Sequence, residues 1–91
     1  MAYVAECFWA GVREQDLADL DRRIAATAAV EQVRYLGRLL VLEDEVVLVL
    51  FEGPLAAVRH LADAAGIPFE RLLQVSFALR ADPTADEEES R

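Results

Sequence analysis

The chain has 91 residues, a formal net charge of −8 and a hydrophobic fraction of 55%. Its length indicates one domain, and its longest apolar run, Val46 to Phe51, is far shorter than the roughly 20 residues that cross a bilayer. The negative charge opposes the neutralisation of phosphates that drives nucleic-acid binding. We therefore expect no nucleic-acid partner and no membrane partner.

Cys7 is the single cysteine, so it cannot form a disulfide within the chain. The N-terminus lacks the basic and apolar segments of a secretion signal. Unpaired thiols are typical of reducing compartments, and these features together predict a cytoplasmic protein. Because no second thiol or lysine lies near it in the sequence, we expect Cys7 to be a small packed hydrophobe.

The first predicted element is a strand over residues 2–9, which contains β-branched and aromatic residues and is followed by the breaker Gly11. A helix is predicted next, from residue 14 to about residue 29. Its apolar residues recur at helical spacing, with charged residues on the other side. They are Leu17, Leu20, Ile24 and Ala28.

Residues 33–42 and 46–51 predict two more strands. The acidic cluster between them, residues 43–45, is polar and short enough to turn one strand back on the next. These two strands are therefore expected to form a hairpin.

Gly53 and Pro54 open a second predicted helix, since proline suits the first helical position. Gly66 is expected to end that helix in a left-handed conformation, with Ile67 making the accompanying apolar contact. Residues 72–79 predict the fourth strand, because alternate residues are apolar and fall on one face. They are Leu73, Val75, Phe77 and Leu79, with Gln74 and Ser76 on the other face.

The order β-α-β-β-α-β predicts an α+β domain of the ferredoxin-like kind over residues 1–80. Such a domain has a four-stranded antiparallel sheet with two helices on one face. The other face stays open, yet residues 46–51 are apolar on both sides of their strand. A second sheet is needed to cover that face, so we expect a homodimer that forms through the sheet.

The C-terminal residues 81–91 differ from the rest of the chain. Five of them are acidic and Arg91 is basic; the acidic ones are Asp82, Asp86, Glu87, Glu88 and Glu89. Such a segment has too little apolar surface to offset the entropy of ordering it. We expect an acidic, disordered tail.

Three segments carry a resemblance to known proteins: VRYLGRLL at 33–40, FEGP at 51–54 and LADAAGIPFERLLQV at 61–75. They resemble a family of small bacterial ferredoxin-like proteins, some of whose members bind nickel. The matching residues are Glu6, Phe8, Tyr35, Phe51, Glu52, Pro54, Gly66 and Pro68. The resemblance implies the same fold and a ligand- or metal-binding function, with nickel as the implied metal. Many relatives carry a histidine where this chain has Leu61, with His60 one place away.

The element order is also similar, at the level of the fold, to the dimeric α/β barrels. These include heme-degrading and cofactor-independent monooxygenases and polyketide cyclases or isomerases. The alternative function is therefore a cofactor-independent cyclase, isomerase or monooxygenase acting on an aromatic or polyketide-like metabolite. The sequence has no nucleophile–base pair and no phosphate-cradling glycine loop. For that reason we favour a small dimeric ligand- or metal-binding protein.

Glu6 is the most informative polar residue, because it lies inside an otherwise apolar strand. An unpaired carboxylate there would cost several kcal/mol if buried. Glu6 is therefore either a general acid or base or a carboxylate that anchors a ligand, or it is one half of an ion pair with Arg34 or Arg38. The only histidine, His60, is either a second acid, base or metal ligand, or a residue on the solvent side of its helix.

Three aromatic residues, Tyr3, Trp9 and Tyr35, lie on strands that neighbour each other in this topology. They are expected either to line a pocket for a planar organic ligand or to belong to the core or dimer interface. For a metal, the further donors are Cys7, Glu6 and Glu52, at no recognisable metal-binding spacing. The sequence assigns no metal ligand and no cofactor, and nickel is implied by the resemblance alone.

Overall fold

The structure is a computed structural model, and it describes residues 1–78. The acidic tail predicted for residues 81–91 lies outside the described residues. Six elements follow one another: β1 (Ala2–Phe8), α1 (Glu14–Glu31), β2 (Arg34–Val41), β3 (Val46–Glu52), α2 (Leu55–Ala64) and β4 (Arg71–Val75). The predicted order β-α-β-β-α-β is confirmed.

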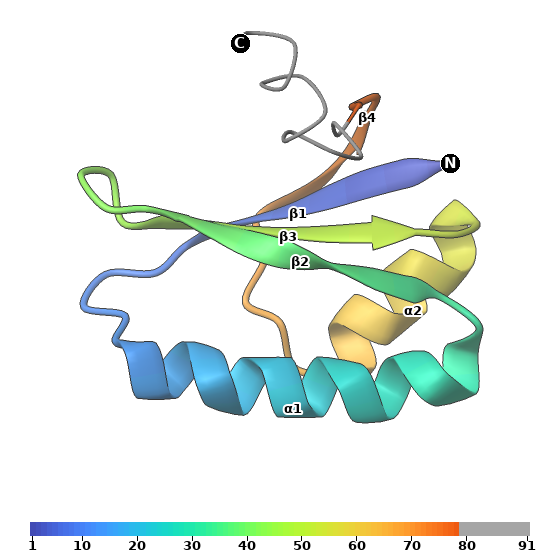
Figure 1. Ribbon diagram of the computed structural model, residues 1–91, viewed down its shortest axis with the longest axis horizontal. Helices are drawn as coiled ribbons and strands as arrows, with labels where there is room; N and C mark the ends of the chain where they lie inside the picture. The colour runs from blue at the N-terminus through green and yellow to red at the C-terminus, as the bar shows by residue number, and fades with distance from the viewer. Residues whose placement is uncertain (79–91) are drawn as a thin grey trace, which may run out of the picture.

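The four strands form one antiparallel sheet in the order β2-β3-β1-β4. Both helices lie on the same side of this sheet (Figure 1). The predicted ferredoxin-like architecture is therefore confirmed, and within residues 1–78 the opposite side of the sheet carries no helix. We call that side the open face.

The sequence of α1 contains its own start and stop signals. The backbone N–H of Arg13 donates to Oδ2 of Asp16 at 2.9 Å, which satisfies a donor just before the first turn. Gln32 ends the helix in the left-handed region, with a φ of 59°. Among residues 1–78, neither helix has the length and apolar character that crossing a membrane requires.

Helix α2 ends at Ala64, and Gly66 stops it in the left-handed conformation, as predicted. The N–H of Ile67 donates to the carbonyl of Ala62 at 3.0 Å, and the N–H of Gly66 donates to that of Asp63 at 3.2 Å. These two bonds, with a φ of 71° at Gly66, form a Schellman motif. Nη1 of Arg23 on α1 donates to the carbonyl of Ala65 at 3.0 Å, so one helix caps the other.

Two strands depart from regular or predicted geometry. The ladder between β2 and β3 shifts its register between Tyr35 and Gly37, where Gly37 has a φ of 133°, so β2 contains a bulge. The fourth strand, predicted over residues 72–79, spans Arg71–Val75. Residues 76–78 are not in a strand, and residue 79 lies outside the described residues.

The core lies between the sheet and the two helices. Its fully buried residues alternate along β1 and β3 and recur along α1 and α2 at helical spacing. They include Ala5, Cys7, Leu17, Leu20, Ile24, Val47, Val49, Phe51, Val58, Leu61 and Ala62. Because strand side chains alternate between faces, the residues between them in β1 and β3 point to the open face.

Candidate functional site

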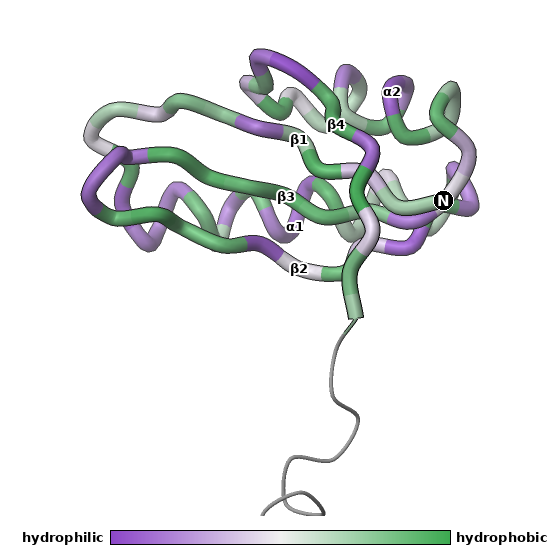
Figure 2. Tube along the Cα trace, turned by 90° about the horizontal axis from the view of Figure 1, so that it is seen from above, coloured by the Kyte–Doolittle hydropathy of each residue, from purple (hydrophilic) through white to green (hydrophobic). Residues whose placement is uncertain are grey.

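The open face is defined by the register of the strands, since residues paired across antiparallel strands point to the same side. Its side chains are Ala2, Val4, Glu6 and Phe8 of β1, Arg34, Leu39 and Val41 of β2, Val46, Leu48, Leu50 and Glu52 of β3, and Arg71, Leu73 and Val75 of β4. Phe8 is 59% exposed and Leu39 is 58% exposed. Figure 2 looks onto this face and shows that β3 is hydrophobic along its length.

The four charged side chains of the open face form two ion pairs. Nε of Arg71 lies 2.5 Å from Oε1 of Glu6, and Nη1 of Arg34 lies 2.6 Å from Oε1 of Glu52. Each pair contains one positive and one negative charge, so the charges on this face cancel. The open face is therefore apolar and neutral in a chain whose formal net charge is −8.

Glu6 stands on β1 between Leu48 of β3 and Arg71 of β4. Its side chain is 16% exposed, whereas that of Arg71 is 62% exposed. The ion pair predicted for Glu6 exists, but the partners named from the sequence, Arg34 and Arg38, were wrong. Arg34 binds Glu52, and Arg38 points to the helix side of the sheet. The choice of Arg71 follows from the pairing of β4 with β1.

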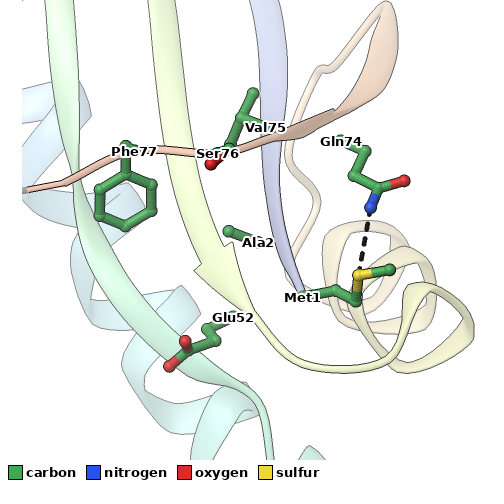
Figure 3. A pocket seen from close by; sticks show the side chains of 7 residues that line it. All are labelled: Met1, Ala2, Glu52, Gln74, Val75, Ser76 and Phe77. Atoms are coloured by element: carbon green, nitrogen blue, oxygen red, sulfur yellow. Dashed lines mark hydrogen bonds between the residues drawn. The ribbon is translucent and has the colours of Figure 1, made fainter.

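A groove lies at the end of the open face where β1 begins and β3 and β4 end (Figure 3). Its volume is about 480 Å³, and its lining is made by Met1, Ala2, Glu52, Gln74, Val75, Ser76 and Phe77. Nε2 of Gln74 donates to Sδ of Met1 at 3.1 Å across one end. The groove thus combines the Phe77 ring with a carboxylate, an amide and a hydroxyl group.

The three aromatic residues singled out from the sequence do not all come together. Tyr3 pairs with Phe51, which pairs with Tyr35, so these three rings form a row on the helix side of the sheet. The rings of Tyr35 and Phe51 lie 5.8 Å apart, centroid to centroid. Trp9 follows the other end of β1, about 20 Å from Tyr3 at the usual rise per strand residue. Tyr3, Trp9 and Tyr35 all pack on the core cluster, and Glu6 lies on the opposite face from Tyr3 and Tyr35.

A polar cluster joins β2 to α1 beside this row. The hydroxyl group of Tyr35 donates to Oδ1 of Asp21 at 2.6 Å, and Nε of Arg38 donates to both oxygens of Asp21 at 3.0 and 3.1 Å. Partial burial on its own raises the pKa of Asp21, but the hydrogen bonds from Arg38 and Tyr35 and the charge of Arg38 outweigh it and lower that pKa. Burial, and then Asp21, raise the pKa of Tyr35. The carboxylate of Asp21 thus accepts hydrogen bonds from both Tyr35 and Arg38. The cluster links strand β2 to helix α1 and has a structural role.

His60 lies on the outer side of α2. Its side chain is 67% exposed, and its Nδ1 lies 2.9 Å from Oε2 of Glu31 at the end of α1. Its neighbour Leu61 is fully buried in the core, as expected from the rotation of about 100° per helical residue. Since α2 covers the face opposite Glu6, His60 and Glu6 of one chain lie on opposite sides of the sheet.

Cys7 is fully buried between the sheet and the helices. Its burial, and then the charges of Glu70 and Glu6, raise the pKa of the thiol to about 11. The prediction that Cys7 is a packed small hydrophobe is confirmed. A thiol held in this protonated form is a poor nucleophile and a poor metal ligand.

The side chains do not fit the nickel site that the family resemblance implies. The family's histidine position is Leu61, inside the core, and His60 is paired with Glu31. Within residues 1–78, no group of three or more His, Cys, Asp or Glu side chains is placed to hold a metal ion. We therefore assign no step and no ligand set to nickel.

Sequence reasoning missed Arg71 and the groove residues Gln74, Ser76 and Phe77. The sequence did contain one signal for Arg71. Glu6 is the one charged residue of residues 2–8, and Arg71 is the one charged residue of residues 71–75. Pairing Val4 with Leu73 in antiparallel register places Arg71 opposite Glu6. The groove depends on where the chain turns after β4, which no local pattern specifies.

Comparison with known proteins supports the fold. A crystal structure of the protein SCO4226 from Streptomyces coelicolor A3(2) superimposes with a TM-score of 0.74 at 17% sequence identity, over 87% of this chain and 100% of that one. No known family profile matches the sequence, and no curated protein does either. At this identity the similarity establishes a small ferredoxin-like α+β fold.

Proposed function

We propose that this protein is a homodimeric ligand-binding protein whose two copies pack through their open faces. The observation that carries this proposal is the open face itself, which is apolar, partly exposed and neutral. An apolar face of this kind marks an interaction surface. A second copy of this chain carries the same apolar face, so two copies can pack through it around a two-fold axis.

Charge favours a second copy at this face over any other part of the surface. Two chains of formal net charge −8 repel one another in general. On the open face, however, Glu6 is paired with Arg71 and Glu52 with Arg34. Association through this face therefore adds no unbalanced charge and buries exposed residues such as Phe8 and Leu39.

The groove at the end of the open face is the ligand site in this proposal. Its volume of about 480 Å³ falls in the range of small-molecule sites. Packing a second sheet about 10 Å above the first adds a wall to a groove that one chain leaves open. Phe77 then supplies an apolar contact, and Ser76 supplies a hydrogen bond that orients the ligand.

The oligomeric state tests the first part of the proposal. Sedimentation velocity at micromolar concentration should show a dimer, and Leu39→Asp on the open face should convert it to the monomer of 10.1 kDa. Val30→Asp is the matched control, because Val30 is 77% exposed on α1, away from this face. A monomeric wild-type protein, or dimers in both variants, would exclude this interface.

Ligand binding is tested with 2-naphthol as a neutral planar probe, followed by NMR. We expect saturable shifts of the backbone amides of Gln74 and Ser76 in the wild-type protein. Phe77→Ala should weaken binding about tenfold, a change of about 1.4 kcal/mol. Leu39→Asp should weaken it as well, by opening the site. Shifts spread over the whole open face without saturation would exclude the groove as the site.

A further inference from the structure

We propose that the Glu6–Arg71 ion pairs of two copies meet at the centre of the dimer interface and form a cluster of four charges that aligns the subunits. This inference rests on the proposed function, since it requires the open faces to pack on one another. It goes further by naming the polar contact that selects a second copy of this chain as the partner.

The position of the pair supports a meeting across the interface. β1 is one of the two central strands of the sheet, and Glu6 lies on it between Val4 and Phe8, with Leu48 beside it on β3. Arg71 lies on the neighbouring edge strand β4 and contacts the carboxylate of Glu6. An isologous interface brings the same patch of both subunits together around a two-fold axis. Groups near the middle of that patch therefore lie close to their own counterparts, whereas the groove at the end of the sheet lies far from the axis.

The pair also has hydrogen-bonding groups to spare. In the described part of the chain, the only hydrogen bond between these side chains joins Nε of Arg71 to Oε1 of Glu6. The two terminal nitrogens of the guanidinium group and Oε2 of the carboxylate remain for other partners. The Arg71 side chain is 62% exposed, so this surface is accessible to solvent in a single chain.

Covering the open face removes that water. A charged group that loses its hydration is tolerated only when new donors or acceptors replace the lost ones. The same ion pair in a second copy offers both: its guanidinium nitrogens can donate to the free oxygen of Glu6, and its own free oxygen can accept from Arg71. The pair is thus self-complementary, and an unrelated apolar partner would leave these groups unsatisfied.

Charge reversal tests whether the pairs meet. Glu6→Arg places four positive charges at the proposed axis of its homodimer, and Arg71→Glu places four negative ones. The dissociation constant of each variant's homodimer should therefore be at least tenfold higher than that of the wild-type dimer. An equimolar mixture restores two charges of each sign, so native mass spectrometry should show the heterodimer in at least tenfold excess over both homodimers. The double variant Glu6→Arg/Arg71→Glu should form a homodimer again.

Neutral substitutions are a second test in case the charge-reversed variants do not fold. Circular dichroism shows whether each variant is folded. Glu6→Gln leaves two arginines facing each other and should weaken the dimer about tenfold, while Glu6→Gln/Arg71→Gln should recover most of that loss. If the wild-type protein is a dimer but the reversed variants do not prefer each other and Glu6→Gln has no effect, the inference is wrong and the dimer stands. If the wild-type protein is a monomer, the proposed function and this inference both fall.

Discussion

The hydroxyl group of Tyr35 donates a hydrogen bond of 2.6 Å to Oδ1 of Asp21. Tyr35 belongs to β2, the strand at one edge of the sheet, and Asp21 belongs to α1. The carboxylate also accepts from Arg38 of the same strand. Two side chains of the edge strand β2 are therefore hydrogen-bonded to one acidic residue of helix α1.

Removing that hydroxyl group should destabilise the fold. Tyr35→Phe deletes a hydrogen bond to a charged acceptor and keeps the ring on Phe51, so we expect the free energy of unfolding to fall by roughly 1–2 kcal/mol. Urea denaturation followed by circular dichroism measures this. Tyr3→Phe is the matched control, since the hydroxyl group of Tyr3 makes no side-chain hydrogen bond within residues 1–78. Equal effects of both changes would contradict the role given to Asp21.

The same carboxylate makes stability depend on pH. The pKa of Asp21 is lowered below its ordinary value of 3.8 in the folded protein, so the folded state binds that proton less readily than the unfolded chain. The resulting stabilisation is present above pH 3.8 and is lost as the pH falls through the folded pKa. Thermal melts from pH 6 to pH 2 should show a gap between the wild-type protein and Asp21→Asn that closes toward low pH. A gap that stays constant would rule this out.

Two glycines separate the cost of backbone conformation from the cost of crowding. Gly11 and Gly66 have nearly the same φ, 73° and 71°, but a Cβ atom at Gly66 would lie 2.9 Å from Nη1 of Arg23, whereas one at Gly11 would meet nothing within 4 Å. We expect Gly11→Ala to destabilise by about 1 kcal/mol through its left-handed backbone. Gly66→Ala should cost about 1 kcal/mol more, because it also displaces the Arg23 cap. Equal losses in urea denaturation would show that Arg23 moves aside freely.

The thiol of Cys7 should react only when the protein unfolds. It is fully buried, and its pKa is raised to about 11, so at pH 8 little of it is the reactive thiolate. Ellman's reagent at that pH should label the native protein at least 100-fold more slowly than the protein in 6 M guanidinium chloride. Cys7→Ala/Ser76→Cys, with an exposed thiol, is the control and should react at once. Fast labelling of native Cys7 would show that the core opens readily.

The periodicity of the sequence was sufficient to predict the elements and their order. Apolar residues at helical spacing, such as Leu17, Leu20 and Ile24, locate the first helix, and the acidic residues 43–45 locate the hairpin turn. Gly66 marks the end of α2 through a local rule of backbone geometry. Each of these signals is local, so it survives without knowledge of the tertiary structure.

The candidate site depends on contacts between distant residues, and these were harder to predict. The partner of Glu6 depends on the register between β1 and β4, which brings Arg71 beside it across 65 positions of the chain. Trp9 and Tyr3 have the same parity in sequence, but Tyr3 lies near the start of β1 and Trp9 follows its other end. The distance along the strand, and not the face, separates them, and a list of aromatic residues does not contain that distance.

The bulge in β2 has a consequence for how copies of this chain meet. An edge strand presents unpaired backbone N–H and C=O groups, which recruit strands from other chains into growing filaments. In β2, which spans Arg34–Val41, the shift between Tyr35 and Gly37 breaks the regular spacing of those groups near the start of the strand. A chain that is 55% hydrophobic is thereby protected from adding strands without limit at this edge. In the proposed dimer, association takes place instead through the face of the sheet, where one partner closes the assembly.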